Sequence, residues 1–351
     1  MRYFLLLASI LLVACNQTTF MNVDEFRLVK VENVSTADQD SSFRTEFPEV
    51  INPLNLQIVK DTILVIQDQI SDATETHFKA YSLNDYRYLG SFLHNGRGPE
   101  DVVSPYVVKS LIDDVTLNLV DGATGEAYKV DVSGFITKSK GAKIQKYNLP
   151  NNIVDWVPLD KTIHFVQLCE RDEFVFQVLD SNKGLLDKLN IFQGIDINNA
   201  TYLSLQMAKR VGYSQVAMVM CFFPQLSIYN VNDGTSMAVA VNKDFRDWKS
   251  IMARRLSPSA TQYYSSITTS SDYIYAVYRD IPIGRLCESG IGSSIHVFDW
   301  DGNFKYDIKV KESIGQMTYD EKNSCLYCIE LSEGRIIRYD MTSLFAVNNS
   351  M

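Results

Sequence analysis

Residues able to carry out chemistry are few in this sequence, and they form no recognisable site. The four histidines are His77, His94, His164 and His296. They include no close pair and no H-E-x-x-H motif, so the signature of a zinc hydrolase is absent. The run Asp299–Asn303 begins like a calcium-binding EF-hand loop, but the twelfth position is Val310 instead of glutamate, which favours a hairpin turn. Phosphate-binding loops and nucleophile elbows are also missing. We therefore expect no metal and no cofactor, and no residue can be named as catalytic.

Cys325 and Cys328 have the C-x-x-C spacing of redox and zinc sites. They lie in a β-rich run, and residues three apart on a strand point to opposite faces. A thioredoxin-like site needs this motif at a helix N-terminus, and a zinc site needs two more ligands close by. We interpret both cysteines as buried structural residues.

The first fifteen residues are typical of a bacterial lipoprotein leader. Arg2 supplies a positive charge, Tyr3–Val13 form an apolar run too short to span a bilayer, and small residues precede Cys15. We predict a signal peptide over residues 1–14, lipid attachment at Cys15 and a tether over residues 15–22, because several acyl chains anchor a protein stably where one is marginal. The alternative is an ordinary secretory signal in which Cys15 is incidental. The expected location is the cell envelope, anchored by lipid in the outer membrane.

Composition narrows the function of the remaining chain, residues 23–351. The full sequence has a net charge of −9, which gives no electrostatic basis for binding nucleic acid. A hydrophobic content of 46% is enough for a packed core. The longest later apolar run, Val216–Phe223, is too short to cross a membrane. The membrane is therefore expected as a partner only through the lipid.

A hairpin pattern recurs six times along the chain: a β-rich run, a turn of Asn, Asp, Gly or Ser, and a second β-rich run. The copies are anchored at Tyr81, Tyr128, Leu179, Tyr229, Phe298 and Tyr339, at intervals of 47, 51, 50, 69 and 41 residues. Another pair of strands precedes each hairpin, for example Tyr263–Thr268 and Tyr273–Tyr278. Four strands every 40–50 residues is the spacing of a propeller blade. The sequence therefore predicts an all-β fold, a single six-bladed β-propeller.

The sixth hairpin is followed by only ten residues after Met341, and they make a poor outer strand. Near the start of the mature chain, Phe26–Val34 alternates apolar and polar residues well. We predict that this N-terminal segment supplies the missing outer strand of the last blade, which would close the ring and remove an exposed edge.

The segment Tyr88–Glu100, Y-L-G-S-F-L-H-N-G-R-G-P-E, resembles the loop after the first blade in the TolB-like six-bladed propeller lipoproteins of gut anaerobes. Gly96, Gly98, Pro99 and Glu100 carry the resemblance, although Glu100 stands where that family has a glycine after the proline. The resemblance implies the fold and the compartment. It implies no catalytic residue.

The lengths of the loops suggest which face of the propeller binds a partner. The turns within the first and second pairs of strands of each blade are short, whereas most long loops fall on the opposite face, which we call the long-loop face. Function tends to reside on loops that a rigid scaffold displays. One insertion, Asp244–Arg255, reads as a short helix that either packs on the propeller through its apolar stripe or forms a lid. The candidate binding residues on this face are Arg97, Glu100, Arg171, Trp248 and Arg285.

We expect a non-catalytic binding or scaffolding module for a glycan, peptide or envelope protein. The alternative is a polysaccharide hydrolase or lyase whose carboxylates come from several blades and meet at the mouth of the channel. A third possibility is a ring whose loops serve only assembly with another lipoprotein. Two or more carboxylates converging in one pocket would favour the enzyme.

Overall fold

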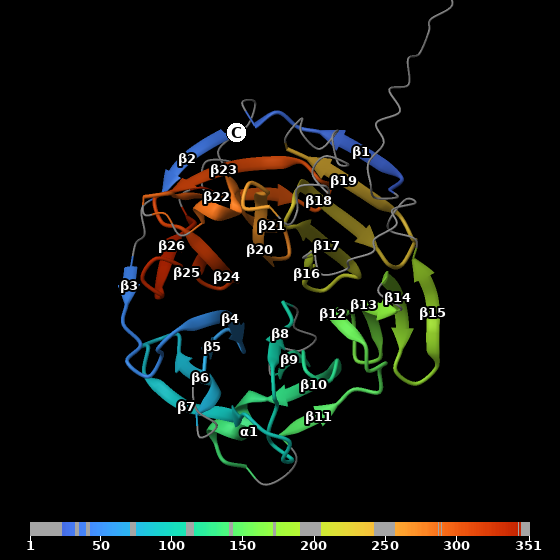
Figure 1. The fold of residues 1–351 in the computed structure, drawn as a ribbon, viewed down its shortest axis with the longest axis vertical. Coiled ribbons are helices and arrows are strands. Elements are labelled where there is room, and N and C mark those ends of the chain that lie inside the picture. Colours follow the sequence, from blue (N-terminus) through green and yellow to red (C-terminus); the bar gives the residue numbers. More distant parts are fainter. Residues whose placement is uncertain are drawn as a thin grey trace, which may run out of the picture.

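The computed structural model describes residues 23–31, 35–39, 43–70, 75–109, 116–139, 143–170, 173–189, 205–241, 257–286, 288, 290–342 and 344. Six sheets stand around a central axis, and one edge strand of each sheet lies nearest the axis (Figure 1). The predicted all-β, six-bladed propeller is therefore confirmed. No described residue belongs to a helix long and apolar enough to cross a bilayer.

Each blade contains four strands that are consecutive in the sequence, apart from the fourth strand of blade 6, and the sheets of blades 4 and 5 each include a fifth strand from the N-terminal segment. Blade 1 contains β4 (Pro53–Val59), β5 (Ile63–Asp68), β6 (Thr76–Ser82) and β7 (Tyr88–His94); blade 2 contains β8 (Pro105–Val107), β9 (Thr116–Asp121), β10 (Glu126–Asp131) and β11 (Ile144–Lys146), with the helix α1 (Val132–Ile136) between the last two. Blade 3 contains β12 (Ile153–Pro158), β13 (Ile163–Glu170), β14 (Glu173–Asp180) and β15 (Gly184–Leu189); blade 4 contains β16 (Leu205–Lys209), β17 (Gln215–Met220), β18 (Phe223–Asn230) and β19 (Ser236–Ala240). Blade 5 contains β20 (Thr261–Thr269), β21 (Tyr273–Pro282), β22 (Ser293–Asp299) and β23 (Phe304–Val310), with a 3-10 turn at Ile283–Arg285; blade 6 contains β24 (Ile314–Asp320), β25 (Cys325–Glu330), β26 (Arg335–Asp340) and β3 (Phe43–Thr45).

An N-terminal strand closes the ring, as expected, but the predicted segment was wrong. The strand paired with β26 is β3, with Thr45 opposite Ile336. The predicted segment contains most of β1 (Glu25–Leu28), which instead lies parallel to β19 as a fifth strand of blade 4. A further strand, β2 (Ser35–Gln39), lies parallel to β23 in blade 5. The alternation of apolar and polar residues correctly predicted a strand, but it does not determine which edge of which sheet the strand joins.

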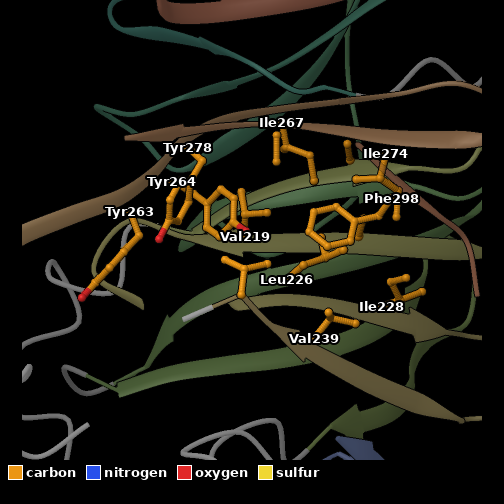
Figure 2. Packing of buried hydrophobic residues seen from close by; sticks show 14 of the residues in the cluster. Val219, Leu226, Ile228, Val239, Tyr263, Tyr264, Ile267, Ile274, Tyr278 and Phe298 are labelled. Carbon is orange, nitrogen blue, oxygen red and sulfur yellow. The ribbon is translucent and has the colours of Figure 1, made fainter. Parts of the chain in front are cut away.

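Buried hydrophobic side chains form six clusters among the described residues, one at each interface between neighbouring blades. Figure 2 shows the interface of blades 4 and 5, where Leu226 and Val239 from blade 4 pack near Ile274 and Phe298 from blade 5. Because every blade lies between two others, both faces of its strands are buried, and the central strands carry continuous apolar runs.

The C-x-x-C motif lies on the buried strand β25, and both thiols are free. Cys325 packs in the cluster between blades 6 and 1, whereas Cys328 packs in the cluster between blades 5 and 6. The prediction of buried structural cysteines on opposite faces of a strand is confirmed. Asp299–Asn303 is the predicted hairpin turn, in which the Asp299 carboxylate accepts a hydrogen bond from the Asn303 amide at 2.8 Å.

The predicted distribution of loops needs correction in blade 2. We expected a tight turn at residues 132–134 and a long loop over residues 137–152 on the long-loop face. Instead, Val132–Ile136 form α1, and the whole connection to β11 belongs to the opposite face. Asp131 caps this helix, because its carboxylate accepts a hydrogen bond from the Gly134 amide at 2.9 Å. The predicted helix Asp244–Arg255 lies outside the described residues.

Candidate binding cavity between blades 5, 6 and 1

A cavity of about 750 Å³ opens on the long-loop face. Its walls come from the first residues of the innermost strands β4, β20 and β24 and from the connections β21–β22 and β25–β26. These innermost strands surround the axis (Figure 1), so the cavity lies near the axis, over blades 5, 6 and 1. Its volume is within the range of ligand pockets in proteins.

Two side chains of β20, Gln262 and Ser265, reach this cavity from positions three apart. On a regular strand they would point to opposite faces. The pairing of β20 with β21 shifts register twice here, between Gln262 and Tyr264 and between Tyr264 and Ser266. Bulges re-aim side chains in this way. The double irregularity therefore places an amide and a hydroxyl on one wall.

Arg279 of β21 completes this polar wall. The side chain is buried, and its Nη2 donates a hydrogen bond to the carbonyl of Ile314 in blade 6. Gln262 donates from Nε2 to the sulfur of Cys221 in blade 4 at 3.4 Å. These contacts connect the two side chains to both neighbouring blades.

Below the cavity, blades 5 and 6 are joined by side-chain hydrogen bonds. The Ser266 hydroxyl donates to Oε1 of Gln316 at 3.0 Å and accepts from the amide of Met317 at 3.3 Å. Nε2 of Gln316 donates to the carbonyl of Ser265 at 3.5 Å. Gln316 also lines the cavity, so the cavity is built on a connected, rigid scaffold.

The opposite wall is aliphatic. It includes Leu54 from the start of β4 and Leu331 from the β25–β26 connection, which are 45% and 49% exposed. Ile51, just outside the cavity, is 76% exposed. Single exposed leucines are ordinary, but several around one concave opening indicate an interaction site.

Lys109 crosses the axis of the propeller. Its Nζ donates hydrogen bonds to the carbonyls of Leu56 in blade 1 at 2.7 Å and of Met317 in blade 6 at 3.1 Å. Its backbone, two residues beyond β8, forms a bridge with Ala208 in blade 4. Burial lowers the pKa of the Lys109 amine to about 7. Lys109 thus connects blade 2 to blades 1 and 6 through its side chain and to blade 4 through its backbone.

The family model described as TolB-like 6-blade propeller-like matches residues 33–322, more than half of the chain. The chain belongs to this family. No protein of the curated set matches it. A solved structure from Bacteroides fragilis, described as an exported protein, has the same fold, with 12% identity, a TM-score of 0.55, and coverage of 87% of this chain and 98% of that one. A DUF4221 family member from Bacteroides vulgatus is also similar, with 11% identity, a TM-score of 0.52, and coverage of 91% and 97%.

In this TolB-like propeller, one predicted binding residue lies at the cavity. Arg285 is at its rim, where Nε donates to Oε2 of Glu288 at 2.9 Å, and Glu288 lines the cavity. Both side chains are about half exposed, so this ion pair contributes little to stability. Arg171 and Trp248 lie outside the described residues.

Arg97 and Glu100 lie in the β7–β8 connection, and neither contributes to the cavity. Both are exposed, and the Glu100 carboxylate accepts a hydrogen bond from Lys143 at 3.1 Å. The glycines of this motif make room for the Asp101 carboxylate, since a Cβ at Gly96 would lie 2.6 Å from it and one at Gly98 would lie 2.5 Å away. Glycine at both positions thus allows the turn to pass close to the Asp101 carboxylate.

The residues of the polar wall were missed in the sequence. Ser265 lies in the predicted strand Tyr263–Thr268 and Gln262 just before it, whereas Arg279 directly follows the predicted strand Tyr273–Tyr278. The signal that unites them is the pair of register shifts, which depends on the partner strand and leaves no mark in the local pattern.

Proposed function

We propose that this chain is a non-catalytic binding module of the cell envelope, and that its partner binds in the cavity between blades 5, 6 and 1. The observation that carries the proposal is the pairing of a polar wall with an exposed aliphatic wall in one concave site. Ligand pockets combine these features, with a few placed polar groups in a mainly apolar lining. Covering Leu54 and Leu331 would contribute about 1–2 kcal/mol each.

The number of carboxylates in the lining supports binding over hydrolysis. Glu288 is the one carboxylate among the described residues that line the cavity, and Arg285 binds it at the rim. Glycoside hydrolysis uses a pair of carboxylates on either side of the scissile bond. The described lining therefore fits the binding module better than the alternative of a polysaccharide hydrolase or lyase.

The cavity can be tested with variants of matched exposure. Leu331→Asp places a charge on the aliphatic wall, whereas Leu186→Asp changes a leucine of similar exposure, 50%, on the outer strand β15 of blade 3. Arrays of short peptides and of envelope oligosaccharides serve as probes for the lipid-free protein. We expect Leu331→Asp to weaken the strongest hits at least tenfold and Leu186→Asp to leave them unchanged. Equal binding by both variants would place the site elsewhere.

We further propose that the mature chain is held to the membrane by lipid on Cys15. The leader sequence supports this proposal, as does one structural relative that is described as an exported protein. Changing Cys15→Ser should stop labelling with a radioactive fatty acid and release the protein from the membrane fraction, because the acyl chains are its only predicted anchor. Cys169→Ser, at a half-buried free cysteine, is the control and should stay membrane-bound. Undiminished membrane retention of Cys15→Ser would refute the anchor.

A further inference from the structure

We infer that the ligand of this cavity is an extended peptide that places an aliphatic side chain against Leu54 and Leu331 and the main-chain N–H and C=O of one residue against the polar wall. The inference rests on the proposed function, since it names the class of ligand for the same cavity. It commits to a peptide rather than a saccharide because of the chemistry of the two walls.

The polar wall can complement a peptide group. The Oε1 atom of Gln262 and the hydroxyl of Ser265 are buried without a hydrogen-bond partner among the described residues. A buried polar atom without a hydrogen-bond partner lowers the stability of the folded protein, and such atoms are rare in native structures. Both residues line the cavity. Rotation of the Ser265 side chain turns its oxygen toward the cavity, and rotation of the Gln262 amide does the same in exchange for the 3.4 Å contact of Nε2 with Cys221. Gln262 would then accept a hydrogen bond from a ligand N–H.

A ligand carbonyl has donors on the same wall. The Ser265 hydroxyl can donate as well as accept, and Arg279 brings its guanidinium to this wall. One acceptor and adjacent donors on a single wall match the N–H and C=O of one residue, which point to the same side of an extended chain. A saccharide hydroxyl could satisfy either group, but it offers no such donor and acceptor at a fixed spacing.

The aliphatic wall favours a hydrocarbon side chain. Leu54, Leu331, Pro53, Leu286 and Ile329 line the cavity, and none of its described lining residues is aromatic. Aromatic rings provide the flat apolar faces on which planar or ring-shaped ligands stack. Branched aliphatic side chains instead pack well around another aliphatic side chain. A leucine, isoleucine or valine of the ligand fits this wall.

The wall residues lie on different blades, which sets the length of the ligand. The polar wall belongs to blade 5, whereas Leu331 belongs to blade 6 and Leu54 to blade 1. A ligand that touches Leu54, Leu331 and the polar wall must span three blades. An extended peptide of a few residues is long enough, and its side chains stand roughly perpendicular to its main-chain N–H and C=O groups, so that the two kinds of group can contact different walls.

The test uses blocked tetrapeptides, acetylated and amidated, with a central leucine, serine or aspartate. Binding to the full mature protein is measured by fluorescence polarisation. We expect the leucine peptide to bind at least tenfold more tightly than the serine or aspartate peptide. N-methylation of the peptide nitrogen of the leucine removes its N–H and should weaken binding at least tenfold.

Gln262→Met shows whether that N–H meets the predicted acceptor. In this variant the N-methyl and parent peptides should bind with similar affinity, because the acceptor is gone. Leu331→Asp should abolish the preference for leucine, and Leu186→Asp is again the matched control. Thermal unfolding of every variant establishes that it is folded.

The outcomes separate the two proposals. If oligosaccharides bind and Leu331→Asp abolishes their binding, the cavity is the site but the peptide inference is wrong. If the peptides bind without regard to the central residue or to N-methylation, the inference is also wrong. If Leu331→Asp changes the binding of neither the peptides nor the oligosaccharides, the proposed site itself is wrong.

Discussion

Two ionisable residues near the axis have environments that oppose their charge. Lys109 is buried, and its amine donates only to the carbonyls of Leu56 and Met317 in the described contacts, so its charge meets oxygen dipoles instead of a carboxylate. Burial also raises the pKa of the Asp155 carboxyl to about 7, although the Trp156 amide donates to it at 2.8 Å. These shifts make stability depend on pH in two different windows.

The Lys109 amine has a lower pKa in the folded protein, about 7, than its ordinary value of 10.5. Between these values the unfolded chain binds more protons, so the contribution of Lys109 to stability rises with pH and is lost as pH falls through 7. We expect wild type to gain stability relative to Lys109→Met between pH 7 and 10, by at most about 1.4 kcal/mol per pH unit. Urea unfolding of both proteins across this range measures the difference, and parallel curves would contradict the prediction.

The contribution of Asp155 to stability changes with pH in the opposite direction. Its pKa is raised from 3.8 to about 7, so the folded protein binds more protons between these values. Its contribution is present below pH 4 and is lost as pH rises toward 7. Relative to Asp155→Asn, wild type should therefore lose stability between pH 4 and 7 in the same unfolding experiment. A constant difference between the two proteins from pH 4 to 7 would contradict this prediction.

Three N-terminal strands on the outside of the ring have different partners. β1 and β2 lie parallel to the outer strands of blades 4 and 5, which already have four strands without them. β3 pairs antiparallel with β26 and is itself the fourth strand of blade 6. Removing β3 therefore leaves a blade incomplete and a central strand exposed as an edge, whereas removing β1 does not.

Stepwise truncation separates these roles. Starting from residue 23, deletions to residue 34, 40 and 45 remove β1, then β2, then β3. We expect the last step to lower the melting temperature more than the first, because it opens the ring at blade 6. Thermal unfolding followed by circular dichroism makes the comparison. A larger fall at the first step would show that β1, through its contacts with blade 4, closes the ring instead.

At the scale of the whole molecule, the ring is continuous. Each of the six blade interfaces has its own buried hydrophobic cluster, and each cluster includes side chains from the strands of both blades. Lys109 adds contacts across the axis, and β3 joins the N-terminal segment to the last blade. A blade that unfolded alone would expose the clusters on both of its faces.

We therefore expect the mature chain to behave as one domain, residues 23–351, with a single cooperative transition. Unfolding curves from far-ultraviolet circular dichroism and from tyrosine and tryptophan fluorescence should coincide, as they do for a two-state protein. Limited proteolysis should give no stable fragment smaller than the ring. Two separate transitions, or a resistant core of two or three blades, would contradict this prediction.

The sequence by itself determined the blade count, the phase of the hairpins and the burial of Cys325 and Cys328. Each of the six anchors, from Tyr81 to Tyr339, lies on the third strand of its blade. These features are local, because a turn of Asn, Asp and Gly and the alternation beside it depend only on neighbouring residues.

Only the tertiary structure decided which edge each N-terminal strand joins and where a cavity forms. Phe26 and Thr45 both lie in β strands, but their partners, Ala238 and Ile336, are hundreds of residues away. Gln262 and Ser265 share a wall because two shifts against β21 turn them the same way, and Leu331 faces them from another blade. Pairing and register are set by the packing of the whole ring, so the pattern of one strand does not contain them.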